Sequence, residues 1–235
     1  MKKIGMLVMA VMLPILSMAH GYWLETKGSG KVGEPVKVLL FFGEYGANLR
    51  EKGTKLDKMA DIKVALIDVV GNKTDIQMTQ TDTHWEGTFT PKTAGNYQIL
   101  GINDTREVQD WTKHKLGITR PVQFLRTNYV AGNIPNNQSK TYQFFDIVAE
   151  LQKDVLKITI IKDKQPSEKT SVTIINPQTW EKTNLTNTDG TVTFPLAGKG
   201  LYLIEAEWID TTKGNFKGKD YESIRYKSET TFVVN

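Results

Sequence analysis

The chain has 235 residues, of which 39% are hydrophobic and 24% charged, and its formal net charge is +4. This composition is typical of a globular protein and excludes a disordered chain or a bundle of membrane-spanning helices. The absence of cysteine excludes disulfides, thiolate metal sites and cysteine nucleophiles, so any bound metal needs nitrogen and oxygen ligands. The length suits one large domain or two small ones.

Residues 1–19 have the pattern of a cleaved signal peptide. Two lysines precede an apolar run at 4–16, and Ser17-Met18-Ala19 follows with the small-x-small pattern of a cleavage site. The run is shorter than the roughly 20 residues that cross a bilayer as a helix. We therefore expect cleavage after Ala19 and a periplasmic protein that does not span the membrane. Without the two lysines, 28 of the 30 basic residues remain against 26 acidic ones, which gives no electrostatic reason for nucleic-acid binding.

Short segments rich in β-branched and aromatic residues recur along the chain, with partial period-2 alternation. They fall at 36–42, 62–67, 157–161, 171–175 and 230–234. Turn residues such as Gly71-Asn72 and Asp189-Gly190 separate them. No long segment has the periodicity of an amphipathic helix, so the pattern predicts an all-β protein built from antiparallel sandwiches.

One strand-corner-strand pattern occurs twice. Residues 87–99 and 190–204 each contain a strand ending in proline, a glycine, and a tyrosine two residues after that glycine, namely Tyr97 and Tyr202. This arrangement is typical of a corner in an immunoglobulin-like sandwich, although a β protein can produce it by chance. Its recurrence predicts two β-sandwich domains, at 20–125 and 141–235. The linker is expected at 126–140, which contains a polar, turn-forming stretch.

No catalytic motif is present. The chain has three histidines and lacks a G-x-S-x-G elbow, a phosphate-binding glycine loop and an H-E-x-x-H pair. Its carboxylates are scattered, and no glycosidase pair can be selected from them. We therefore expect a protein that is not an enzyme.

His20 is the most informative residue, because cleavage after Ala19 makes it the first residue of the mature chain. Its free α-amino group and its imidazole can together chelate a divalent transition metal, and nickel, cobalt and copper all accept nitrogen donors. Further ligands are needed. We expect His84 first, and then a carboxylate such as Glu25; Glu205 and Glu207 are alternatives. Two neighbouring lysines disfavour His114.

A second hypothesis gives His20 no special role. In that case the protein is a structural or ligand-binding module for glycans or a partner protein. Tryptophan side chains stack on sugars when they are exposed in a row, although they are more often buried in a sandwich core. The candidates are Trp85, Trp111, Trp180 and Trp208.

The sequence also resembles a family of bacterial exported proteins that are described as periplasmic components of cobalt or nickel uptake. The resemblance rests on AHGYWLE at 19–25, GEPV at 33–36, NTDGTVTFPL at 187–196, GLYLIEA at 200–206 and DYES at 220–223. The segment at 187–196 also resembles transthyretin-like sandwiches. Relatives carry a histidine near Glu207, where this chain has glutamate. The resemblance implies two β-sandwiches, periplasmic residence, capture of nickel or cobalt, and an inner-membrane uptake permease as partner.

Overall fold

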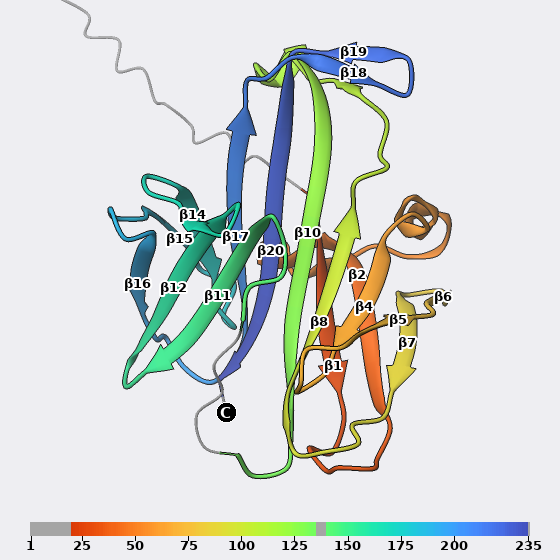
Figure 1. Ribbon diagram of the computed structural model, residues 1–235, viewed down its shortest axis with the longest axis vertical. Coiled ribbons are helices and arrows are strands. Elements are labelled where there is room, and N and C mark those ends of the chain that lie inside the picture. The colour runs from red at the N-terminus through yellow and green to blue at the C-terminus, as the bar shows by residue number, and fades with distance from the viewer. Residues whose placement is uncertain (1–19, 135–139, 235) are drawn as a thin grey trace, which may run out of the picture.

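The computed structural model describes residues 20–134 and 140–234, which form an all-β protein (Figure 1). The expected signal peptide at 1–19 lies outside the described residues. Each of the five predicted strand segments overlaps a strand, so the all-β class is confirmed. The helices of the described part are short 3-10 helices, none long and apolar enough to cross a membrane. They are η1 (Tyr45–Ala47), η2 (Gly53–Met59) and η3 (Thr112–His114).

The first outer sheet is built from N-terminal strands in the order β1-β2-β7-β6, and β3 also pairs with β2. These strands are β1 (Gly21–Lys27), β2 (Val36–Glu44), β3 (Leu49–Arg50), β6 (Thr79–Gln80) and β7 (Trp85–Phe89).

The central sheet takes strands from both halves of the chain, in the order β15-β14-β17-β20-β10-β8-β4-β5, and β9 also pairs with β10. From the first half come β4 (Lys63–Ile67), β5 (Lys73–Ile76), β8 (Gly95–Asn103), β9 (Gln109–Asp110) and β10 (Ile118–Ala131). From the second half come β14 (Ser171–Ile175), β15 (Glu181–Leu185), β17 (Gly200–Asp210) and β20 (Ser223–Val234).

The second outer sheet has the order β11-β12-β13, and β16 also pairs with β12. Its strands are β11 (Phe145–Gln152), β12 (Val155–Lys162), β13 (Gln165–Pro166) and β16 (Thr191–Pro195). A separate hairpin, β18 (Gly214–Phe216) and β19 (Lys219–Tyr221), extends from one end of the molecule (Figure 1).

The two outer sheets cover opposite faces of the central sheet. Side chains alternate between the faces of a strand, and β10 shows the consequence directly. Leu125 and Tyr129 belong to the core under the first outer sheet, whereas Val122 and Phe124 belong to the core under the second. The molecule is therefore two β-sandwiches that share one sheet, with β10 and β20 side by side at its middle (Figure 1).

The junction between the sandwiches is a parallel pairing of β10 and β20, from Thr119 opposite Ser223 to Arg126 opposite Thr230. The expected domain boundary at Leu125 falls inside β10, and residues 126–131 of the expected linker belong to that strand. The polar stretch that suggested a linker starts only at Gly132, after the strand has ended. Residues 135–139 of it lie outside the described residues.

Both predicted corners have the geometry of an immunoglobulin-like tyrosine corner. The Tyr97 hydroxyl donates to the Thr93 carbonyl oxygen at 2.9 Å, and the Tyr202 hydroxyl donates to the Gly198 carbonyl oxygen at 2.7 Å. In each case the bond runs four residues back along the chain. The two-sandwich prediction is thus confirmed, with one tyrosine corner in each sandwich.

A buried ion pair ties the central sheet to the second outer sheet. The Arg126 guanidinium donates to Asp146 Oδ2 at 2.7 Å, and both side chains are completely buried. Arg126 also donates to Gln98 Oε1 at 2.8 Å, and Asp146 Oδ2 accepts the backbone N–H of Tyr142 at 2.9 Å. These additional hydrogen bonds compensate the buried charges. Because Arg126 lies on β10 and Asp146 on β11, the pair fixes the start of β11 against β10.

Candidate functional site

His20 directly precedes β1 and lies at the mouth of a cavity between the two halves of the molecule. Its Nε2 lies 2.9 Å from Glu51 Oε1, and its ring centroid lies 5.1 Å from that of Phe42. The side chain is 36% exposed. The imidazole is therefore held on two sides and still reaches solvent.

Glu51 reaches His20 because the chain turns back on β2. After η1, β3 pairs with the end of β2, and the backbone N–H of Glu51 donates to the Phe42 carbonyl oxygen at 2.8 Å. Gly43 allows this return, because a Cβ there would collide with the carbonyl oxygen of Leu49. The β1–β2 register places Gly21 opposite Gly43, so Glu51 lies beside the residue that precedes Gly21.

The Glu51 carboxylate determines which ring nitrogen of His20 carries a proton. Hydrogen bonds, first from Lys55 at 2.6 Å and then from His20, lower the pKa of Glu51 below its ordinary value of 4.5. Glu51 is thus ionised near neutral pH and can only accept a hydrogen bond. Nε2 of His20 must then be the donor, and in the neutral imidazole the Nδ1 lone pair remains free.

The other two predicted ligands, Glu25 and His84, lie on the opposite face of the first outer sheet. Glu25 follows His20 at an odd spacing along β1, so its side chain points away from the His20 side. Its Oε1 accepts from Trp23 Nε1 at 2.8 Å and from Arg50 at 2.7 Å. Glu25 is therefore already paired with a cation.

His84 packs against Phe41, with ring centroids 5.3 Å apart, whereas His20 packs against Phe42. Because adjacent residues of β2 face opposite ways, the first outer sheet separates the two histidines. His84 Nδ1 lies 2.8 Å from Thr83 Oγ1, and its Nε2 lies 3.5 Å from Glu86 Oε2. The structure does not bring His20, Glu25 and His84 together, and the expected ligand set is corrected on this point.

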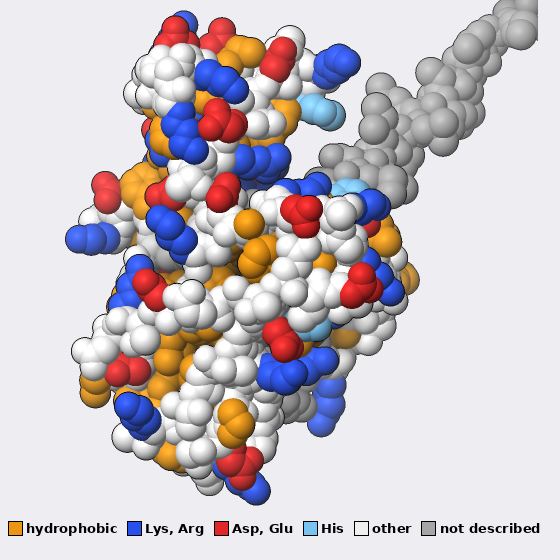
Figure 2. Space-filling model, turned by 90° about the vertical axis from the view of Figure 1, so that its right-hand side faces the viewer, with side chains coloured by type: hydrophobic (Ala, Val, Ile, Leu, Met, Phe, Trp, Pro, Cys, Tyr) orange, Lys and Arg blue, Asp and Glu red, His pale blue; other side chains and the backbone are white. Residues whose placement is uncertain are grey.

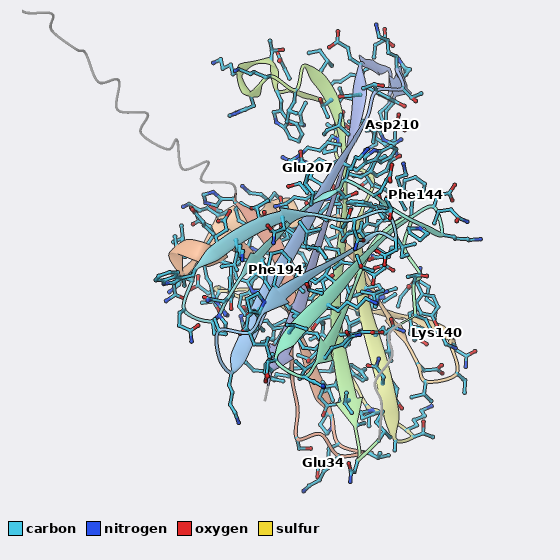
Figure 3. The ribbon with its side chains drawn as sticks, turned by 90° about the vertical axis from the view of Figure 1, so that its left-hand side faces the viewer. Glu34, Lys140, Phe144, Phe194, Glu207 and Asp210 are labelled. Atoms are coloured by element: carbon cyan, nitrogen blue, oxygen red, sulfur yellow. The ribbon has the colours of Figure 1, made fainter. Side chains whose placement is uncertain are left out.

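The alternative ligands are each paired with a cation, and the Glu205 carboxylate also lies beside Gly21, where a Cβ would be 3.3 Å from its Oε1. Glu205 pairs with Lys227 at 3.0 Å, and Glu207 pairs with Arg225. Figure 3 shows Glu207 on β17, within the upper half of the molecule. His114 is exposed in η3. Across residues 20–134 and 140–234, no group of three or more His, Asp or Glu side chains is arranged to hold a metal ion.

The cavity beside His20 has a volume of about 440 Å³ and is strongly basic. Figure 2 shows this face of the molecule hollowed between its upper part and its lower body, with lysine and arginine side chains along the hollow. The β10–β20 pairing forms one wall, where Pro121 lies opposite Arg225 and Gln123 opposite Lys227. The charged residues of the lining are Glu51, Lys55, Lys58, Arg106, Arg225 and Lys227.

Glu229, a residue of β20, contacts the start of β1. It is fully buried and accepts from Lys227 Nζ at 2.7 Å and from the side chain of Gln123. It also accepts the backbone N–H of Tyr22 at 3.3 Å. Burial raises the pKa of Glu229 to about 7, against the opposing effect of Lys227. A Cβ at Gly21 would collide with this carboxylate, so a glycine directly after His20 is required for the contact.

Hydrophobic packing fixes the position of β1 as well. Trp23, Leu39 and Phe41 on the outer face of the first sheet pack with Ile175 and Leu203 of the second half. The outer face of the first sheet thereby packs against β14 and β17. His20 directly precedes β1. Its position is therefore set by its own contact with Glu51 and by the packing of β1 against the second half of the chain.

The four tryptophans of the glycan hypothesis do not form a row. Trp85 packs against the first core and donates to the Leu56 carbonyl oxygen at 3.0 Å. Trp111 lines the cavity beside His20, and Trp208 stacks on Tyr226 with centroids 5.3 Å apart. Trp180 is 77% exposed between β14 and β15.

The fold and the site define the class of protein, a pair of β-sandwiches sharing one sheet, with a partly exposed histidine at the start of its first strand. The chain belongs to the DUF4198 family, because the model of this domain of unknown function matches residues 17–210. Comparison with curated proteins finds no match.

Two solved structures show low similarity. The D0-D1 domain of intimin is 12% identical, with 92% of this chain and 100% of that chain covered and a TM-score of 0.25. Native alpha-2-macroglobulin from Escherichia coli, spanning domains NIE-MG1, is 10% identical, with 88% and 97% covered and a TM-score of 0.24.

Proposed function

We propose that this protein is a periplasmic, non-enzymatic metal-binding protein. Its mature N-terminus captures a divalent transition metal, nickel or cobalt, through the α-amino group and Nδ1 of His20. The protein then delivers the ion to an inner-membrane uptake permease. The signal-peptide pattern supports the periplasmic location, and the permease follows from the sequence resemblance.

The hydrogen bond between His20 and Glu51 carries the proposal. Metal-binding histidines usually donate their second ring N–H to a carboxylate, which fixes the tautomer and makes the ligating nitrogen more basic. The 2.9 Å contact between Nε2 and Glu51 has this form. It leaves Nδ1, the ring nitrogen nearer the backbone, able to form a six-membered chelate with the terminal amine. Glu51 thus replaces Glu25 and His84 as the residue that supports His20.

The terminal amine provides the test. Mature protein beginning at His20 is compared by calorimetry with a variant that carries five additional alanines before His20, using nickel and cobalt. We expect the extension to weaken binding at least tenfold, because the amine leaves the chelate while the imidazole remains. Equal affinity of the two proteins, or no binding by the mature form, would contradict the proposal. Mass spectrometry of the exported protein checks that it starts at His20.

A second candidate function, binding of an organic ligand, is favoured by a separate cavity of about 640 Å³. Its lining includes Phe124, Tyr142, Phe144 and Tyr226, and Tyr142 and Phe144 are 41% and 38% exposed. Aromatic side chains in an open cavity suit the faces of sugar rings. Glycan-array binding that Phe144→Ala abolishes would support this function, and an array without signal would contradict it.

A further inference from the structure

Two cations in the cavity beside His20 have no carboxylate partner in the described part of the chain. Three others do, since Lys55 pairs with Glu51, Arg225 with Glu207, and Lys227 with Glu205 and Glu229. Lys58 and Arg106 form no ion pair among residues 20–134 and 140–234 and contact aromatic rings instead. Lys58 Nζ lies 4.2 Å from the ring centroid of Phe42, and the Arg106 guanidinium lies 5.8 Å from that of Trp111. The excess positive charge of the cavity therefore resides on these two side chains.

Lys58 and the proposed metal ligand His20 line the same cavity. The Lys58 ammonium group and the His20 ring both contact Phe42, at 4.2 and 5.1 Å from the same centroid. The 3-10 geometry of η2 places residues three apart on one side, so Lys55 and Lys58 both face the cavity while Leu56 and Met59 are buried.

Arg106 also lines this cavity, from the segment that follows β8. Burial raises the pKa of the Tyr22 phenol, and the Arg106 guanidinium opposes that rise. Tyr22 also lines the cavity and is the second residue after His20. Lys58 and Arg106 thus flank the site from η2 and from the segment after β8.

The positive charges of Lys58 and Arg106 disfavour binding of a divalent metal ion that enters the cavity without an anion. Like charges repel, and the effect is stronger at a partly buried site than in bulk water. His20 also supplies only two donors, whereas nickel and cobalt take at least four. Both problems are solved if the remaining donors are oxygens of a small anion that enters with the metal and whose free carboxylate pairs with Lys58 and Arg106.

We infer that the cavity beside His20 binds the divalent metal as the anionic chelate of a small di- or tricarboxylate, with Lys58 and Arg106 as the carboxylate-binding residues. This inference rests on the proposed function. The cavity volume of about 440 Å³ leaves room for such a molecule, and lysine and arginine are the side chains that pair with carboxylates.

Equilibrium dialysis tests the inference, with nickel alone, citrate alone, and nickel with radiolabelled citrate as probes. Nickel and citrate retained by the mature protein are both counted. We expect one citrate for each bound nickel, and little retention of citrate without nickel. For the double variant Lys58→Met, Arg106→Gln, we expect at least tenfold weaker retention of nickel citrate. Its affinity for nickel alone should be unchanged or higher, because two repelling charges are gone.

Lys199→Met, at an exposed position outside the cavity, is the matched control and should behave as wild type. Thermal unfolding establishes that each variant is folded. The inference is overturned if nickel is retained from the nickel–citrate mixture without an equal amount of citrate, if citrate is retained equally without nickel, or if the double variant matches the control. If instead the proposed function is wrong, the mature protein retains nickel neither alone nor together with citrate.

Discussion

At the scale of single residues, the site depends on which face of a strand each side chain occupies. Phe41 and Phe42 are adjacent, yet the first packs against His84 and the second against His20. The odd spacing between His20 and Glu25 already predicts opposite faces, given one continuous strand. The position of Glu51 beside His20 could not be predicted in this way, because it depends on the turn after Gly43 that pairs β3 with the end of β2.

Substitution of Glu51 by glutamine tests its role at His20. A neutral amide fixes the imidazole tautomer less strongly and makes Nδ1 less basic, so we expect nickel affinity to fall by about tenfold. Glu34→Gln is the matched control, because Glu34 lies at the lower end of the molecule (Figure 3) and its side chain is 47% exposed. Calorimetry measures both variants, and equal affinities would contradict the assigned role.

Buried Glu229 predicts a pH-dependent stability. Its pKa is raised from 4.5 to about 7 in the folded protein, so the folded state binds a proton more tightly than the unfolded chain. The stability contributed in this way is present below about pH 4.5 and is lost as the pH rises to about 7. Relative to Glu229→Gln, the wild type should therefore lose on the order of 2 kcal/mol of unfolding free energy between pH 5 and pH 8. Urea unfolding at several pH values measures the difference, and parallel pH profiles would refute it.

At the scale of elements, local sequence patterns predicted the strands but not the contacts between the sheets. The five predicted segments became parts of β2, β4, β12, β14 and β20, because β-branched and aromatic residues in alternation specify a half-buried strand. The tyrosine corners were also predictable, since each bond is formed within four residues. The contact between Arg126 and Asp146 was not predictable, because it connects strands of two different sheets.

Removal of one partner of this pair should destabilise the protein strongly. In Asp146→Ala, the buried Arg126 charge loses its counter-ion, which we expect to cost about 3–5 kcal/mol of unfolding free energy. The double variant Arg126→Met, Asp146→Leu leaves no unpaired charge and should lose less than the single variant. Denaturant unfolding compares them. A loss below about 1 kcal/mol in the single variant would contradict the expectation.

At the scale of the whole molecule, the shared central sheet makes the two sandwiches one structure. Parallel pairing of β10 with β20 joins residues about a hundred positions apart, and no local sequence pattern selects such a partner. For this reason the sequence predicted two sandwiches but placed a boundary inside β10. His20 is identifiable from the sequence, whereas Glu51 and the basic cavity come beside it only through the folding of the chain.

The shared sheet predicts cooperative unfolding. Side chains of β10 belong to both large cores, so neither sandwich can unfold without removing a wall from the other. Scanning calorimetry of residues 20–235 should show a single transition whose van't Hoff and calorimetric enthalpies agree. Two resolved transitions would mean that the sandwiches are independent domains.

The most direct test of metal capture is the anomalous scattering of nickel in crystals of the mature protein. We expect a nickel peak bonded to the α-amino nitrogen and Nδ1 of His20, with Nε2 still donating to Glu51. A nickel peak at any other residue, or a peak on Nε2 with Glu51 displaced, would contradict it.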